Sequence, residues 1–205
     1  MEAELKDYEL DRGMRSVYFL RTHRRLYLNA SSLLLQKMAG LPLVPLKAKF
    51  GVARILCELY IQELFETPEE QRASAVERGR EIAGIVAAWV DADAGLESFL
   101  LELPEVEPHL ESQAFLTGLF ASIVSKRFSW ATIRTRETLI FASFLCDLGL
   151  ATLPRELSRM RAKRMNAEQR QQFESHPELA YRMHQECDAK GLSENISLIV
   201  REHHE

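Results

Sequence analysis

The sequence predicts a mainly α-helical protein, a helical bundle preceded by a small N-terminal domain that is either α/β or helical. Three observations carry this prediction. Apolar residues recur at helical spacing over residues 110–128. Thr67-Pro-Glu-Glu70 is typical of a helix start, and residues 133–145 form a helical run that becomes nearly all apolar at its end. With 205 residues, of which 46% are hydrophobic, the chain can build one large domain or two small ones.

Composition excludes several classes of protein. A net charge of −4 and a pI near 5.9 argue against non-specific binding to nucleic acid or to an anionic membrane. Cys57, Cys146 and Cys187 are odd in number and widely spaced, so they form neither a disulfide framework nor a zinc pattern. The acidic, polar N-terminus is no signal peptide, and no apolar run reaches membrane-spanning length. We therefore expect a cytoplasmic protein with reduced thiols.

The first element that the pattern predicts lies in residues 16–29. Residues that favour strands stand at both ends of this segment around a polar centre, which indicates two short strands and a turn. A single amphipathic helix is the alternative. In the hairpin, Arg21, Arg24 and Arg25 would lie in the turn and face solvent, and an anion site is the weaker reading.

The next elements are helical apart from one connection. Residues 31–39 suit a short helix that Gly40 ends, whereas the two prolines of residues 41–46 exclude a regular helix. Residues 52–65 favour a helix, although their centre also suits a strand. Thr67 is expected to cap a long helix that runs to Trp89.

The second half of the chain begins with a glutamate-rich turn between Pro104 and Pro108, the best candidate for a domain boundary. The helix of residues 110–128 should turn one apolar stripe to the core, made of Phe115, Leu116, Leu119, Phe120, Ile123 and Val124. The next helix ends in a lone carboxylate, Asp147, which is costly to bury unless something positive meets it.

Further helices are expected downstream of Pro154. Residues 155–164 are rich in arginine, and Asn166 should cap the helix that follows, with Gln169 at its third position. Residues 178–187 and 192–204 form the last two helices, and the second of them ends in a pair of histidines.

These motifs resemble the HD superfamily, and in particular its HD-GYP branch of cyclic di-GMP phosphodiesterases. The resemblance rests on Cys146-Asp147-Leu-Gly149-Leu150, then Pro154, then His176-Pro177, then Glu202-His203-His204-Glu205, and it covers a little under half of the chain. It implies an HD-type helical bundle at 104–205, incomplete at the C-terminus, behind connector helices at 67–103 and a sensor or adaptor domain at 1–66.

The resemblance also implies a metal centre. Asp147 would bridge divalent metals, commonly iron or manganese, with His176, His203 and His204 as further ligands. Cys146 and Ser112 stand where the family has two histidines, and Leu150 stands where it has the lysine that contacts the phosphate. Arg155, Arg159, Arg161 and Lys163 fall in the family's substrate-covering loop. A metal-free protein is the alternative that these departures leave open.

Two functions follow from the resemblance. The first is a degenerate HD-GYP module of bacterial cyclic di-nucleotide signalling, which binds cyclic di-GMP or a signalling protein and catalyses no reaction. A homodimer is compatible with this function. The second is a metal-dependent cyclic di-GMP phosphodiesterase with a reduced metal site. The replacement of two ligand histidines by Cys146 and Ser112 favours the first function, and the retained aspartate and histidines favour the second.

Overall fold

A computed structural model describes residues 20–102, 110–158, 160, 162–187 and 194–205. All regular elements in these ranges are helices, and no strand occurs among them. The elements are η1 (Arg21–His23), α2 (Arg24–Met38), α3 (Leu46–Glu66), α4 (Glu69–Ala92), α5 (Leu96–Leu101), α6 (Leu110–Ser125), α7 (Ile133–Cys146), η2 (Asp147–Thr152), α8 (Arg155–Ser158), η3 (Ala162–Arg164), α9 (Ala167–Glu174), α10 (His176–Cys187) and α11 (Glu194–Glu202).

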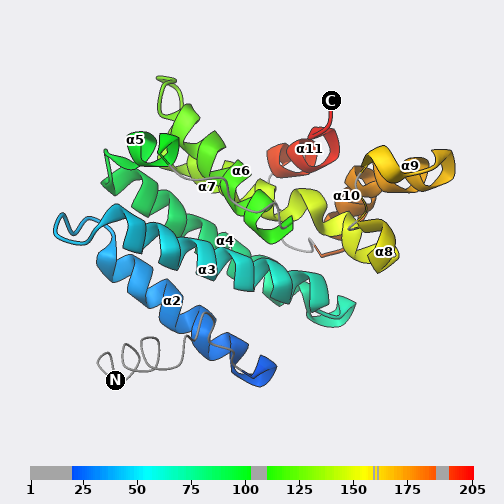
Figure 1. Ribbon diagram of the computed structural model, residues 1–205, viewed down its shortest axis with the longest axis horizontal. Helices are drawn as coiled ribbons and strands as arrows, with labels where there is room; N and C mark the ends of the chain where they lie inside the picture. Colours follow the sequence, from blue (N-terminus) through cyan, green and yellow to red (C-terminus); the bar gives the residue numbers. More distant parts are fainter. Residues whose placement is uncertain (1–19, 103–109, 159, 161, 188–193) are drawn as a thin grey trace.

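The N-terminal part is a layer of three helices in which α2 lies along α3 and α3 beside α4 (Figure 1). The predicted hairpin at residues 16–29 is wrong in its described part, because residues 21–38 are helical and the alternative of one amphipathic helix holds. Leu28 and Leu35, seven residues apart, are buried along one side of α2. Tertiary packing of this seam outweighs the strand preference of the flanking residues.

The three arginines do not form a hairpin tip. Arg24 pairs with Glu66 at 2.6 Å, and Arg25 lies 3.6 Å from Glu63, so two of them join the start of α2 to the end of α3. The side chain of Arg21 lies outside the described residues.

The junction of α3 and α4 corrects a second prediction. Pro68 occupies the N-cap position of α4, and Thr67 is the C-cap of α3, where its Oγ1 donates to the carbonyl of Glu63 at 2.6 Å. The expected helix start is present one residue later, and only two residues separate the helices. The connection at residues 41–45 is non-helical as predicted, and Gly40 ends α2 with a positive φ of 73°.

Helix α7 is the centre of the C-terminal part, because it contacts α4, α6, α10 and α11. One core cluster of buried residues runs from Leu28 in α2 to Val200 in α11, so a separate N-terminal domain is not evident. The expected boundary between Pro104 and Pro108 lies outside the described residues.

Helix α6 buries a narrower stripe than expected. Phe115, Leu119 and Ile123 are in the core as predicted, whereas Phe120 is 45% exposed and Val124 56% exposed. These two side chains turn away from α3 and α7, the main neighbours of α6, toward solvent. Periodicity alone placed them inside because both fall at the edge of the apolar stripe.

The C-terminal end of α4 is held by positive side chains from three other helices. We call this group the α4 terminal cluster, and its contacts are Lys49 to Asp93 at 2.8 Å, Arg136 to Asp91 at 2.8 Å, and the Lys126 ammonium to the carbonyl of Val90 at 2.7 Å. Cations at a helix C-terminus also offset the partial negative charge of its unpaired carbonyls. The cluster fixes α3, α6 and α7 around α4.

Candidate metal centre

Three imidazoles meet where α10 begins and α11 ends. The Nε2 atom of His176 lies 3.2 Å from Nε2 of His203 and 3.3 Å from Nε2 of His204. Among the described residues these three form the group whose possible ligand atoms all lie within 4.8 Å of one another. The sequence prediction that these histidines form one site is consistent with this geometry.

Backbone carbonyls fix the orientation of two of the rings. His176 Nδ1 donates to the carbonyl of Phe173 at 2.6 Å, and His203 Nδ1 donates to the carbonyl of Val200 at 2.8 Å. A carbonyl oxygen can only accept, so each Nδ1 carries the hydrogen, and in the neutral ring Nε2 is the bare nitrogen. Metal-binding histidines are commonly held in this way.

Local structure explains how the chain brings His176 to this place. Asn166 and Gln169 form the expected capping box at the start of α9, and α9 ends at Glu174, two residues before His176. Gly149 of η2 lies against the backbone of α10, where a Cβ would stand 2.1 Å from the His176 carbonyl oxygen. Only glycine permits this approach, which sets the distance between η2 and His176.

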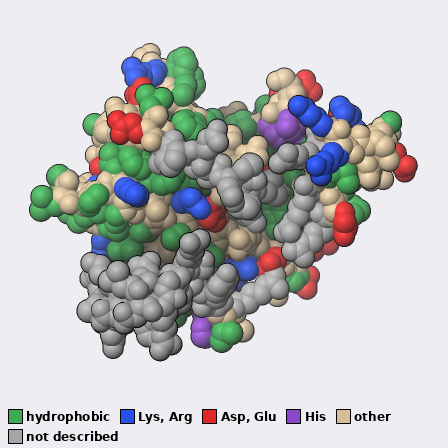
Figure 2. All heavy atoms as spheres, viewed as in Figure 1, with side chains coloured by type: hydrophobic (Ala, Val, Ile, Leu, Met, Phe, Trp, Pro, Cys, Tyr) green, Lys and Arg blue, Asp and Glu red, His purple; other side chains and the backbone are tan. Residues whose placement is uncertain are grey.

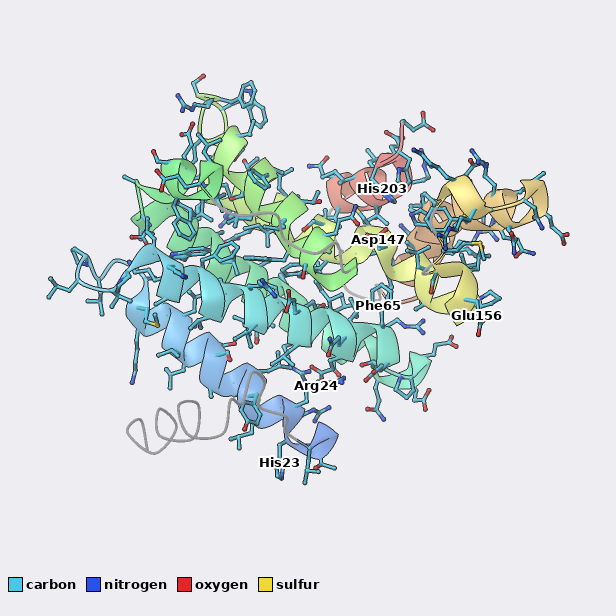
Figure 3. The ribbon with its side chains drawn as sticks, viewed as in Figure 1. His23, Arg24, Phe65, Asp147, Glu156 and His203 are labelled. Atoms are coloured by element: carbon cyan, nitrogen blue, oxygen red, sulfur yellow. The ribbon has the colours of Figure 1, made fainter. Side chains whose placement is uncertain are left out.

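Asp147 lies beside the histidines at the point where α7 ends (Figure 3). Its Oδ1 is 3.5 Å from Nε2 of His176, and its side chain is 22% exposed against 1% for His176. The carboxylate that the sequence singled out therefore does find an imidazole partner. It stands at one side of the group, next to the most buried of the three rings.

Burial lowers the pKa of His176 from its usual value and is the largest influence on it. The Phe173 carbonyl and then Asp147 raise the pKa, and the positive charge that His203 and His204 carry when protonated lowers it with smaller effect. His176 is therefore a neutral imidazole near pH 7, which is the form that binds metal. Two bare nitrogens 3.2 Å apart repel each other unless a cation or a proton lies between them. This donor set fits a divalent metal ion.

The residues that replace functional residues of the resembled family do not belong to the histidine group. Ser112 is buried and its hydroxyl donates to Glu58 of α3. Cys146 has a pKa raised to about 12, first by burial and then by Asp147, so it is a neutral thiol and a poor ligand. Leu150 is buried at 3% exposure.

The predicted basic substrate loop is described only in part. Arg159, Arg161 and the side chain of Arg155 lie outside the described residues, whereas Lys163 is exposed. Figure 2 shows a surface histidine group at the upper right with Lys and Arg side chains next to it. The role of the loop in binding a substrate stays a prediction.

Sequence reasoning missed the two anchoring carbonyls and the part that Gly149 plays. A signal for the first exists, because Phe173 and Val200 each precede their histidine by three residues, the spacing at which a side chain at a helix end reaches a carbonyl. Gly149 stands in the motif Cys146-Asp147-Leu-Gly149-Leu150, but the sequence does not indicate its contact, because the segment that it touches is 27 residues away in the chain.

Comparisons with known proteins agree with this geometry. A family model described as HD domain matches residues 103–205, which is half of the chain. Among solved structures, Bd1817, an HDG"Y"P protein from Bdellovibrio bacteriovorus, is similar with a TM-score of 0.72 at 16% identity, over 95% of this chain and 62% of that one. The likeness shows a common fold, and this chain spans less than two thirds of that structure. No curated protein matches.

No helix among the described residues is long and apolar enough to cross a membrane. The residues that the family model matches contain Asp147 and the three histidines that meet around one point. The fold is an all-helical bundle similar to that of an HD-GYP protein. The chain belongs to the HD domain family.

Proposed function

We propose that this chain is a non-catalytic signalling module that binds one divalent metal ion and, through it, a cyclic di-nucleotide such as cyclic di-GMP. The observation that carries the proposal is the convergence of three Nε2 atoms, two of them on rings that backbone carbonyls hold in the metal-binding tautomer. A protein partner in place of the nucleotide remains compatible with the same site. Iron or manganese suits a site of imidazole and carboxylate.

His176, His203 and His204 would hold the ion, with Asp147 close enough to join them by a small movement. When bound, the metal supplies a positive charge that attracts a phosphate oxygen. Lys163 adds a positive charge on the loop that precedes α9. These residues can bind and orient a phosphodiester.

The residues Ser112, Cys146 and Leu150 support binding of a phosphodiester without its hydrolysis. Phosphodiester hydrolysis by this class of site uses two metals that clamp the attacking and the leaving oxygen. Ser112 donates to Glu58, and the Cys146 thiol is neutral, so neither supplies a ligand for a second ion. Leu150 offers no charge for the scissile phosphate.

A second candidate is a phosphodiesterase with one metal. Asp147 favours it, because a carboxylate 3.5 Å from a ligand imidazole can hold a water for attack. Both candidates require the metal, and they differ in whether cyclic di-GMP is consumed.

The test combines metal analysis with two assays on protein purified without chelator. We expect close to one iron or manganese ion per chain, cyclic di-GMP binding by calorimetry, and no linear product by chromatography. Asp147→Ala should weaken metal binding, and Glu174→Ala, which removes an exposed carboxylate at the end of α9, should leave it unchanged. Hydrolysis that Asp147→Ala abolishes would establish the second candidate. Absence of metal would refute both.

A further inference from the structure

Helix α2 has two apolar sides, and within the described part of the chain only one of them lies in the core. Leu28 and Leu35 face the core, whereas Leu26, Leu33 and Leu34 lie on the opposite side and are 47–68% exposed. With Ala30, these exposed residues form a stripe about 100° wide along the helix. A solvent-facing helix side ordinarily carries charged residues, and this one carries none between residues 26 and 34.

The apolar surface continues in the connection that follows α2. Leu41 is 50% exposed and Leu43 is 96% exposed. Pro42 and Pro45 on either side of Leu43 keep the segment out of a helix. This connection projects at the left edge of Figure 1, where hydrophobic side chains gather on the surface in Figure 2. Seven of the fifteen large hydrophobic residues that are exposed in the described chain lie in residues 20–43, so exposure is concentrated here.

The charge of this region differs from that of the whole chain. Residues 20–57 contain none of the 30 acidic residues, although they contain seven lysines and arginines. Arg24, Lys49 and Arg54 are paired with carboxylates of α3 and of the segment after α4. Lys37 and Lys47 are exposed at the two ends of the connection. The net charge of −4 therefore conceals a basic, leucine-rich region.

We propose that this surface docks on an anionic lipid bilayer. The leucine surface consists of Leu26, Leu33, Leu34, Leu41 and Leu43, with Lys37 and Lys47 beside it. Leucines insert among the acyl chains while the lysines meet the lipid phosphates, as in helices that lie in the membrane interface. Such docking needs no spanning helix. It reverses, for this region, the expectation drawn from the net charge.

The composition of the leucine surface favours a bilayer over a protein partner. Protein interfaces concentrate tryptophan, tyrosine and arginine at their centres. The leucine surface has neither an aromatic nor an acidic residue, and the two lysines beside it match a partner of uniform negative charge. The exposed pair Phe128 and Trp130 between α6 and α7, stacked at 5.4 Å, has the composition expected of a protein contact.

The test is co-sedimentation of the full chain with vesicles of phosphatidylcholine alone or mixed with phosphatidylglycerol. We expect binding to the mixed vesicles only, weakened as salt is raised. Lys37→Glu/Lys47→Glu should lower the affinity by roughly fivefold per lysine or more. The matched control Arg134→Glu/Arg182→Glu reverses two exposed charges elsewhere and should bind as the wild type does.

The leucines are tested by Leu41→Ser/Leu43→Ser, which lies in a connection and should fold normally. It should reduce the vesicle affinity by about tenfold or more. Its control, Leu101→Ser/Val124→Ser, changes residues that are 82% and 56% exposed outside the surface. Failure of the wild type to bind mixed vesicles would overturn the proposal. An equal loss of vesicle affinity in a variant and in its matched control would also overturn it. A dimer in light scattering that only Leu41→Ser/Leu43→Ser disrupts would also overturn it, by assigning the surface to a second copy. Metal content should not change in any variant.

Discussion

The α4 terminal cluster and the histidine group are both polar and partly buried, but their charges are balanced differently. In the α4 terminal cluster each positive side chain meets a carboxylate or a carbonyl at 2.7–2.9 Å, so opposite charges are paired within the protein. In the histidine group Nε2 of His176 faces the Nε2 atoms of His203 and His204 at 3.2–3.3 Å. The first arrangement stabilises the fold, whereas nitrogens of the second repel one another unless a cation or a proton lies between them. This difference separates a structural cluster from a candidate binding site.

The largest effect should come from breaking the balanced cluster. Lys49 is 1% exposed and holds Asp93, so Lys49→Ala leaves a carboxylate without its partner and should lower the free energy of unfolding by about 3–5 kcal/mol. Urea denaturation measures this change. The double variant Lys49→Met/Asp93→Leu removes both charges and should recover most of the loss. A cost below about 1 kcal/mol for Lys49→Ala would contradict a structural role for the pair.

The histidine group should respond to metal where the balanced cluster does not. Addition of Mn²⁺ at about 100 times its dissociation constant should stabilise the folded chain by about 2.7 kcal/mol. A thermal melt with and without the ion, reversed by chelator, measures it. In His203→Ala, which changes a partly exposed residue beyond the end of α11, the gain should disappear while the metal-free melt stays close to the wild type. An equal gain in this variant would place the metal elsewhere.

Gly149 tests whether the spacing of η2 and α10 maintains the site. In Gly149→Ala the new methyl group would meet the His176 carbonyl, so the two segments must separate, at a cost of about 1–3 kcal/mol and with weaker metal binding. Gly51→Ala is the matched control, because nothing lies within 4 Å of the added methyl group in α3. There we expect a gain of about 0.5–1 kcal/mol. Equal effects in the two variants would show that the close approach has no part in the site.

The smallest effect should come from the cap of α9. Asn166 accepts a hydrogen bond from the backbone N–H of Gln169 at 2.8 Å, and Asn166→Ala should cost about 1 kcal/mol. Because α9 ends two residues before His176 and supplies the Phe173 carbonyl, metal affinity should fall slightly as well. Calorimetric titration with Mn²⁺ measures the affinity. Unchanged affinity would mean that α10 alone orients His176.

The sequence by itself determined the features that short-range chemistry sets. Helices α4, α6, α7, α9, α10 and α11 follow from apolar spacing, proline positions and the capping box at Asn166. For α3 the centre also suited a strand, and α8 lies in the segment that was expected to be a loop. The family and its candidate ligands follow from a motif whose residues keep their order in the chain. These features depend on neighbours a few residues apart, which the sequence displays directly.

Tertiary structure decided the rest. Residues 21–38 became helical because Leu28 and Leu35 find a core to pack against, and Phe120 remained 45% exposed because α3 and α7, the main described neighbours of α6, pack against its other side. The sequence could name His176 and His203, but only the packing of α10 and α11 set their nitrogens 3.2 Å apart. Contacts between residues far apart in the chain depend on how helices pack, and the spacing of residues along one helix does not specify its partner.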